Sequence, residues 1–528
     1  MTNATASHVV TEPKPLELPR AYNAATHFID RHLAEGRGAK AAYIDVGGTH
    51  SYSDLAGRVN RAGNALLGLG LEMENRIAMI MLDTIDFPAV FWGAIKAGIV
   101  PIPLNTLLTT KDYGYMLADS RARVLVVSEA LLDKVTPILA DLPFLKQVVV
   151  SGVDAHGHVL LSDLTAKAGA HLEPAPTTSD DVAFWLYSSG STGAPKGAVH
   201  LQRDLAATAH FYGDGVLGIR EDDLCFSAAK LFFAYGLGNG MTFPLHVGAT
   251  TILLADRPTP ESVMAILKDH QPTLFFGVPT LYGTILADPS NRRETASLRM
   301  RACVSAGEAL PEDVGKRWQE RFGAEILDGL GSTEMLHIFL SNRHGEVRYG
   351  TSGKPVPGYA MKIVGDDGRE VPQGEMGELV VNGPSAAVAY WNQREKSMAT
   401  FRGAWTHTGD KYYVDDEGYY RYAGRGDDML KVGGIWVSPF EVEAALIANE
   451  KVLEAAVVGF PDGEGLIKPK AFVVLQSGLN GGEALVEELQ AFVKARLAPY
   501  KYPRWIEFVE TLPKTATGKI QRFKLRTK

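Results

Sequence analysis

The chain has 528 residues, of which 46% are hydrophobic and 22% are charged, the composition of an ordinary globular protein. This length exceeds what one hydrophobic core usually organises, so two or more domains are expected. The net charge is −8, from 53 basic and 61 acidic residues, and no basic block stands out, which argues against a nucleic-acid partner.

The N-terminal segment, residues 1–19, is polar and lacks the apolar core of a signal peptide. No later stretch approaches the roughly 20 consecutive apolar residues of a membrane helix. The two cysteines, Cys225 and Cys303, are too few for a disulfide framework and fit a reducing compartment. We therefore predict a cytoplasmic protein with no membrane partner, and we leave its oligomeric state open.

Strand-like apolar runs alternate with helix-like segments through the first two thirds of the chain. Buried strands are predicted at 76–82, 124–127, 147–150, 251–254 and 273–276. Helices are predicted at 87–97 and 260–268. Such alternation favours largely parallel sheets covered by helices.

A loop rich in Ser, Thr and Gly, residues 187–197, directly follows an apolar strand at 182–186. Its glycines would let the backbone approach a polyanion, its hydroxyls and amides would donate hydrogen bonds, and Lys196 adds a positive charge. Gly197 stands where a Walker A loop needs Ser or Thr, so the loop is not that motif. It predicts a phosphate-binding site, with a flexible surface turn as the alternative.

After about residue 350, short alternating strands such as 377–381 and 418–422 predict a barrel-like antiparallel region. The polar segment 424–428 is a candidate linker. Beyond it, helices are predicted at 440–448 and 483–497 and strands at 455–459 and 471–475. We predict an α/β fold with two domains: residues 1–426, with parallel βαβ subdomains and the barrel-like β region, and residues 427–528, a small mobile α+β domain.

Four more polar motifs follow the loop in chain order. They are DGLGSTE at 328–334, WTHTGD at 405–410, the segment 424–443 that contains KVGG, and LPKTATGKIQR at 512–522. Together with the loop, they resemble the adenylate-forming superfamily of acyl-CoA synthetases, peptide-synthetase adenylation domains and luciferases. The resemblance implies an enzyme that joins a carboxylate to the α-phosphate of ATP, releases pyrophosphate and then passes the acyl group to a second nucleophile.

The resemblance assigns ATP-binding roles to a set of positions shared by these motifs. These are Ser188, Ser189, Gly190, Ser191, Thr192, Gly193 and Lys196 over the β- and γ-phosphates, Thr333 at the α-phosphate, Gly307, Glu308, Ala309, Asp328, Gly329 and Leu330 around adenine, and Asp410 and Arg425 at the ribose. It also implies catalytic roles for Lys519, Thr333 and Glu334. Glu334 would hold Mg²⁺, a hard cation that suits carboxylates. Lys519 would bridge the substrate carboxylate and the α-phosphate, and a solvated surface lysine is its alternative.

Asp427 matches the hinge position of the superfamily, about which the small domain is implied to rotate between the two half-reactions. That rotation would replace Lys519 by the segment that carries Lys431, Gly433, Gly434 and Trp436, the implied contacts of CoA. Glycines allow close approach of a thin pantetheine arm. An ordinary glycine turn is the alternative.

Within the superfamily the acceptor is either CoA or the thiol of a carrier protein, and no carrier domain is evident in the sequence, so CoA is expected. Residues 231–236 contain no acid, whereas enzymes that activate amino acids usually place an Asp in this region for the substrate ammonium. An uncharged, apolar acyl group is therefore favoured. Phe233 stands near the position where many members carry His, so the chain departs from the superfamily there and lacks that gating or positioning residue.

Residues 228–239 and 331–339 closely resemble the aryl-CoA ligases that activate benzoate. The resemblance implies an acyl pocket lined by Ala234, Tyr235, Ala306, Gly307, His337 and Ile338. Such a slot suits a flat ring, and no general base is needed because benzoate is already ionised at neutral pH. For Tyr235 and Ile338 the alternative is plain core packing.

We therefore expect an enzyme that converts benzoate to benzoyl-AMP and then to benzoyl-CoA. It would take an aromatic carboxylate, ATP and CoA, with Mg²⁺, and release AMP and pyrophosphate. The alternatives are a CoA ligase for hydroxybenzoate, aminobenzoate or a cyclic aliphatic acid and, from another class, a catalytically inactive nucleotide-binding regulatory protein.

Overall fold

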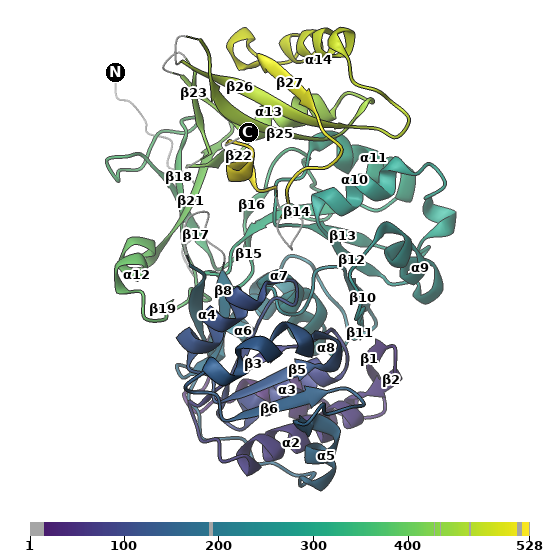
Figure 1. Ribbon diagram of the computed structural model, residues 1–528, viewed down its shortest axis with the longest axis vertical. Helices are drawn as coiled ribbons and strands as arrows, with labels where there is room; N and C mark the ends of the chain where they lie inside the picture. Colours follow the sequence, from purple (N-terminus) through teal and green to yellow (C-terminus); the bar gives the residue numbers. More distant parts are fainter. Residues whose placement is uncertain are drawn as a thin grey trace.

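The computed structural model describes residues 15–188, 194–426, 428–432, 435–463, 466–514 and 520–526. Within these residues, a large N-terminal part holds four sheets, and a smaller C-terminal lobe lies at one end of the molecule (Figure 1). The predicted α/β class, with a large N-terminal domain and a separate C-terminal domain, is confirmed. The boundary between residues 426 and 427 stays a prediction.

A five-stranded parallel sheet lies in the N-terminal half, in the order β4-β3-β5-β6-β7. Its strands are β3 (Arg76–Ile80), β4 (Val100–Pro103), β5 (Val124–Ser128), β6 (Gln147–Ser151) and β7 (Val159–Leu160). Both faces are covered by helices, which explains the unbroken apolar runs. Ile77 and Met79 share a core with α3 (Asp86–Lys96), whereas Ala78 and Ile80 share another with α4 (Thr110–Ser120).

The largest sheet has nine strands, in the order β16-β15-β14-β13-β12-β10-β11-β1-β2. Its parallel strands are β1 (Ala41–Asp45), β10 (Leu224–Ser227), β11 (Thr250–Ile252), β12 (Leu274–Gly277), β13 (Ala302–Ser305) and β14 (Ile326–Gly331). Antiparallel strands occupy its edges: β2 (Gly48–Ser51) at one, and β15 (Ile338–Ser341) and β16 (Lys354–Pro355) at the other. The helices α9 (Pro260–His270), α10 (Pro279–Ala287) and α11 (Glu312–Phe322) connect its successive strands from β11 to β14.

Two antiparallel sheets carry the WTHTGD motif and the strands on either side of the loop rich in Ser, Thr and Gly. The first contains β8 (Val182–Ser188), β9 (Lys196–Leu201) and β19 (Ala389–Tyr390). The second contains β17 (Ala360–Val364), β18 (Gly377–Asn382), β20 (Phe401–Arg402), β21 (Trp405–Val414) and β22 (Tyr420–Arg425), and it is the region predicted to be antiparallel after about residue 350. Because β22 runs to Arg425, the predicted linker 424–428 was placed too early: its first two residues pair with β21.

The C-terminal lobe has its own core. It contains the hairpin of β23 (Leu430–Val432) and β24 (Ile435–Val437), a sheet of β25 (Val452–Pro461), β26 (Ile467–Leu475) and β27 (Trp505–Phe508), and the helices α13 (Pro439–Ile447) and α14 (Glu483–Lys494). Val442, Leu446, Val457, Val473 and Leu489 meet in this core. A separate core is what an independently moving domain requires.

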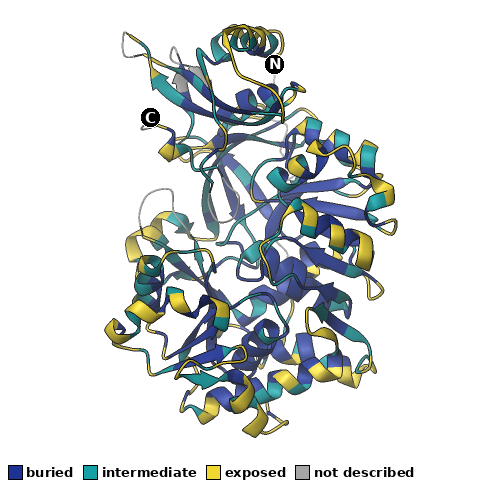
Figure 2. Cartoon of the chain, turned by 45° about the vertical axis from the view of Figure 1, so that its right-hand side comes forward, coloured by how far each residue is buried: buried dark blue, intermediate teal, exposed yellow. Residues whose placement is uncertain are grey.

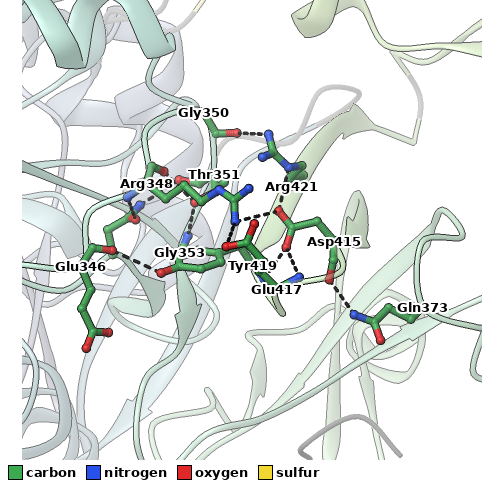
Figure 3. Close-up of polar contacts among 11 residues, drawn as sticks. Glu346, Arg348, Gly350, Thr351, Gly353, Gln373, Asp415, Glu417, Tyr419 and Arg421 are labelled. Carbon is green, nitrogen blue, oxygen red and sulfur yellow. Dashed lines mark hydrogen bonds and ion pairs between the residues drawn. The ribbon is translucent and has the colours of Figure 1, made fainter. Parts of the chain in front are cut away.

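A polar network fastens the turn between β21 and β22 to the loop that follows β15 (Figure 3). Asp415 accepts hydrogen bonds from the backbone N–H of Tyr419 (2.9 Å) and from Nε of Arg421 (3.0 Å). Arg348 forms an ion pair with Glu417 (2.7 Å) from the other side. The network therefore joins the sheet that carries Asp410 and Arg425 to the nine-stranded sheet.

The inner strands of the nine-stranded and five-stranded parallel sheets are buried, and exposed residues lie mainly on the outer faces of helices and in loops (Figure 2). Among the described residues, no helix is both long enough and apolar enough to cross a membrane.

Candidate active site

A cavity of about 1000 Å³ with a lining of mixed polarity lies where the nine-stranded sheet, the two antiparallel sheets and the C-terminal lobe meet. Its lining includes Pro279, Gly307 and Thr333, which follow the carboxyl ends of β12, β13 and β14. Ligands of open α/β sheets bind at this edge of the strands. The C-terminal lobe contributes residues 520–523 to the same cavity.

At one end of the cavity, three polar side chains meet around the Glu334 carboxylate. Its Oε1 accepts hydrogen bonds from the Tyr390 hydroxyl (2.7 Å) and from the Ser188 hydroxyl (3.3 Å). Nζ of Lys196 donates to the Tyr390 hydroxyl (3.2 Å) and lies 4.4 Å from the centre of that ring. Burial lowers the pKa of the Lys196 ammonium, and the Glu334 carboxylate acts in the opposite direction. The group combines a carboxylate with a cation, so it can bind both a metal ion and phosphate oxygens.

Thr333, next to Glu334, is held through its backbone. Its carbonyl oxygen lies 2.8 Å from Nε2 of His200, and Nδ1 of the same ring lies 3.0 Å from the Asp204 carboxylate. His200 and Asp204 are fully buried. The peptide after Thr333 is therefore fixed by a buried hydrogen-bond chain, while Thr333 itself lines the cavity.

Also in the lining, Asp410 in β21 and Arg425 in β22 are paired in register and form an ion pair of 3.1 Å. Arg425 also donates to the carbonyl oxygen of Thr408 (3.3 Å). The carboxylate and the guanidinium therefore form one polar edge of the cavity, a suitable partner for vicinal hydroxyls.

The floor of the cavity is formed by Gly307–Ala309 and Asp328–Leu330. Gly307 has φ +97°, a conformation that glycine adopts without strain, and this bends the chain away from the end of β13. Asp328 is buried, which raises its pKa well above the usual range of a carboxyl. A Cβ on Gly329 would lie 2.8 Å from the Leu340 carbonyl oxygen, so only glycine fits there.

A second, more apolar cavity of about 600 Å³ adjoins the first. It is lined by Ala234, Tyr235, Ala306, Gly307, His337 and Ile338, all six predicted pocket residues. Gly307, Gly331 and Thr333 line both cavities. The two spaces therefore meet beside Thr333, the residue predicted to lie at the α-phosphate.

Tyr235 and His337 form a rigid wall of the smaller cavity. The Tyr235 hydroxyl donates to the carbonyl oxygens of Val304 (2.9 Å) and Gly277 (3.1 Å), and Nε2 of His337 lies 3.2 Å from the Tyr235 carbonyl oxygen. Burial lowers the pKa of His337 to about 3, so its imidazole is neutral at pH 7. The wall accordingly presents an uncharged surface to the ligand.

The C-terminal lobe contacts this site through its last segment. The backbone N–H of Ile520 donates to Oε1 of Glu308 (2.9 Å). Arg522 forms a bidentate pair with the buried Glu443, at 2.9 and 2.7 Å, and both residues line the larger cavity. The lobe therefore closes one side of that cavity.

Several predicted residues lie outside the described residues. They are Ser189, Gly190, Ser191, Thr192, Gly193, Asp427, Gly433, Gly434 and Lys519. The side chains of Lys431 and Trp436 are likewise not described, although β23 and β24 pair these two positions. The roles of these residues stay predictions.

Three features of the site were not predicted from the sequence: Tyr390, His200 and the Arg522–Glu443 pair. Tyr390 stands in a two-residue strand paired with β9, and no local motif marks it. His200 and Asp204 have helical i, i+4 spacing, a weak signal that is common in ordinary helices.

Comparison with known proteins gives two family matches. The family described as "AMP-binding enzyme" matches residues 30–391, and the one described as "AMP-binding enzyme C-terminal domain" matches residues 441–519. The chain is 61% identical over 528 residues to a benzoate–CoA ligase of Thauera aromatica, covering 100% of this chain and 99% of that protein. It is 53% identical over 508 residues to a 4-hydroxybenzoate–CoA/benzoate–CoA ligase of Rhodopseudomonas palustris, covering 96% and 94%.

Solved structures show the same similarity. A benzoate CoA ligase from Burkholderia xenovorans LB400 superposes with a TM-score of 0.90 and 53% identity, covering 96% of this chain and 100% of that one. An anthranilate CoA ligase in complex with anthranoyl-AMP superposes with a TM-score of 0.94 and 43% identity, covering 97% and 98%.

Proposed function

The chain belongs to the AMP-binding enzyme family, and we propose that it is an ATP-dependent benzoate–CoA ligase. Its first half-reaction joins benzoate to the α-phosphate of ATP, which yields benzoyl-AMP and releases pyrophosphate. The second transfers the benzoyl group to CoA and releases AMP. The observation that carries the proposal is the junction of the two cavities at Gly307, Gly331 and Thr333. An acid bound in the smaller cavity presents its carboxylate to a nucleotide bound in the larger cavity.

In this proposal ATP occupies the larger cavity. Asp410 accepts hydrogen bonds from the ribose hydroxyls, with Arg425 beside it, and residues 307–309 and 328–330 enclose the adenine. Lys196 and the loop that precedes it neutralise the β- and γ-phosphates, since a lysine is a compact cation with three donors. Thr333 reaches the α-phosphate, where the two cavities join.

The Glu334 group fits Mg²⁺. Its carboxylate and the neighbouring hydroxyls of Ser188 and Tyr390 are hard oxygen ligands or partners for the waters that this cation keeps. When bound, Mg²⁺ supplies charge neutralisation to the phosphate oxygens. The Tyr390 hydroxyl orients the carboxylate that would hold it.

The reacting carboxylate is already ionised, so the enzyme needs positioning and charge neutralisation rather than a base. Tyr235 and His337 hold the ring by apolar contact, which leaves the carboxylate oxygens at the junction. Lys519 approaches these oxygens from the C-terminal lobe in the proposed first half-reaction and stabilises the charge that develops there. Rotation at Asp427 then brings Lys431, Gly433, Gly434 and Trp436 toward the pantetheine of CoA.

The test is a balance of products. Purified enzyme with ATP, Mg²⁺, benzoate and CoA is expected to yield AMP, pyrophosphate and benzoyl-CoA in equal amounts. Accumulation of benzoyl-AMP without thioester would contradict the CoA half. Nucleotide binding without any turnover would favour the inactive regulatory protein.

A competition panel of 2-, 3- and 4-hydroxybenzoate, 2-aminobenzoate and cyclohexane carboxylate then ranks kcat/KM against benzoate. We expect benzoate to lead, with hydroxylated acids lower by about tenfold to a hundredfold, because an apolar pocket discriminates a single hydroxyl only modestly. If a hydroxy- or aminobenzoate gave the highest kcat/KM, that acid would be the proposed substrate in place of benzoate.

Location in the cytoplasm stays a prediction from composition.

A further inference from the structure

A group of potential metal ligands lies on the surface behind the smaller cavity. His210 and Asp214 stand four residues apart in the π-helix η4 (Ala209–Asp214), and His246 stands in the neighbouring helix α8 (Phe243–Val247). One ligand atom of each residue lies within 4.8 Å of the ligand atoms of the other two. Within the described part of the chain, no other three His, Cys, Asp or Glu side chains meet this condition.

We propose that His210, Asp214 and His246 bind one divalent transition-metal ion, with Zn²⁺ as the expected species. Two imidazoles and one carboxylate are a common ligand set for zinc, and a water completes a tetrahedral site. Ligands at 2.0–2.1 Å from a zinc ion lie roughly 3.3 Å apart, so closing this site takes only small side-chain rotations.

Two further observations favour a metal ion. The His210 and Asp214 side chains are exposed, and within the described residues neither forms a hydrogen bond or ion pair that a metal ion would have to break. Nδ1 of His246 shares a 3.0 Å hydrogen bond with Nε2 of His27, and the two rings are stacked. That contact occupies Nδ1 of His246 and fixes the ring, as the outer partners of metal-bound histidines do, and the proposal assigns Nε2 as the metal ligand.

Arg31 places a positive charge near the proposed site, and this charge opposes the binding of a cation. Its guanidinium donates to the His246 carbonyl oxygen. Glu35 partly offsets it through an ion pair of 3.5 Å. The Asp214 carboxylate supplies the negative charge on the ligand side. The site is therefore expected to hold a divalent cation without carrying a large net charge.

The position of the site suggests what it does. Tyr212 of η4 and Phe243 of α8 both pack against the His337 ring, with centroid distances of 5.3 and 4.5 Å. A metal ion that joins η4 to α8 would therefore clamp the two elements that support the wall of the proposed acyl pocket. This role rests on the proposed function, whereas metal binding itself does not.

The test uses the full-length enzyme, stripped with a chelator and studied without ATP, Mg²⁺ or benzoate. Zn²⁺ titrated by calorimetry, with metal analysis after dialysis, is expected to bind at one ion per chain. Co²⁺ as a second probe should give the visible absorption of a low-coordinate site. Zinc should also slow hydrogen–deuterium exchange in residues 209–214 and 243–247.

Variants locate the site. H210N, D214N and H246Q should each weaken zinc binding by at least about tenfold, and H27Q by about tenfold through the outer contact. The exposed pair His171 and Glu173 is the matched control, so H171N should bind zinc as the wild type does. E334Q should also retain zinc, which separates this ion from the proposed Mg²⁺.

No stoichiometric zinc, or zinc that survives H210N and D214N unchanged, would overturn the proposal. These outcomes are independent of ligase activity, so they do not depend on whether the proposed function is correct.

Discussion

At the scale of single residues, Tyr390 is the clearest unpredicted member of the site. Its hydroxyl donates to the Glu334 carboxylate at 2.7 Å and accepts from Lys196 at 3.2 Å. One hydroxyl therefore sets the spacing between the proposed metal ligand and the proposed phosphate-binding lysine. Such a group acts by positioning charged partners rather than by chemistry of its own.

Tyr390→Phe should slow benzoyl-AMP formation by about tenfold to a hundredfold, because a hydrogen bond to a charged group contributes roughly 1.5–3 kcal/mol. Benzoate-dependent exchange of pyrophosphate into ATP measures this step. Tyr419→Phe is the matched control, since among the described residues its hydroxyl donates only to the Glu346 carbonyl oxygen, at 3.4 Å. Equal exchange rates in the two variants would contradict the role of Tyr390.

Gly238 lies directly against His337, a residue of the proposed acyl pocket. A Cβ at this position would lie 2.3 Å from Cδ2 and 2.6 Å from Nε2 of His337. Gly238→Ala should therefore displace the His337 ring into the pocket. We expect kcat/KM for benzoate to fall by at least about tenfold, because misplacement by about 1 Å is costly to a positioned reaction.

The KM for ATP should stay close to that of the wild type, because Gly238 lines neither cavity. Gly57→Ala in α2 (Tyr52–Gly68) is the control, as no atom lies within 4 Å of its new Cβ. An unchanged kcat/KM for benzoate in Gly238→Ala would show that the His337 wall does not hold the acid.

At the scale of elements, the turn between β21 and β22 has to be anchored for Asp410 and Arg425 to face the cavity. Asp415 supplies the anchor, and its side chain is 15% exposed. Burial alone would raise its pKa, but the Tyr419 N–H and the Arg421 guanidinium outweigh burial and hold the pKa below the usual range. A depressed pKa means that the folded state favours the carboxylate.

Asp415→Asn should lower the free energy of unfolding by about 1–3 kcal/mol at pH 7. Because the folded pKa lies below the unfolded value of about 3.9, this contribution is complete above that value and disappears as the pH falls through the folded pKa. Tm measured from pH 7 down to pH 3 should therefore show a gap between the variant and the wild type that narrows toward acid. Asp367→Asn, with a side chain that is 63% exposed, is the control and should follow the wild type throughout.

The positions of the buried parallel strands were predicted well from the sequence. Apolar runs bounded by turns gave β3, β5, β6 and β12 to within two residues, because burial on both faces leaves little choice of residue. Strand ends were less accurate: β3 stops at Ile80 rather than at residue 82, and β25 begins at Val452 rather than at residue 455. Such ends depend on the partner strand, which local periodicity does not reveal.

The site, too, could be predicted only where its residues lie in local sequence motifs. The motifs predicted Glu334, Asp410 and Arg425, which line one cavity. They could not predict Tyr390, since its role arises only when β19 pairs with β9 and brings distant residues together. Long-range pairing of this kind leaves no spacing pattern in a single sequence.

At the scale of the whole molecule, the C-terminal lobe has its own core and meets the larger part through polar contacts, such as the Ile520 N–H to Glu308, and apolar ones, such as the Phe440 ring against Tyr422. Interfaces of mixed polarity are typical of domains that move relative to one another. In the structure, residues 520–523 of the lobe line the larger cavity, which is the proposed ATP site.

If the lobe delivers Lys519 only in that arrangement, the two half-reactions must depend on this residue to different degrees. Lys519→Ala should reduce benzoyl-AMP formation by about a hundredfold to a thousandfold, the usual loss when one preorganised group that stabilises transition-state charge is removed. Thioester formation from supplied benzoyl-AMP and CoA should continue at nearly the wild-type rate, because the rotated lobe would present residues 431–436 instead. Lys524→Ala, a nearby lysine outside the predicted site, should change neither rate. Equal loss of both steps in Lys519→Ala would mean that one fixed arrangement serves both half-reactions, and that the separate core of the lobe stabilises the fold without permitting rotation.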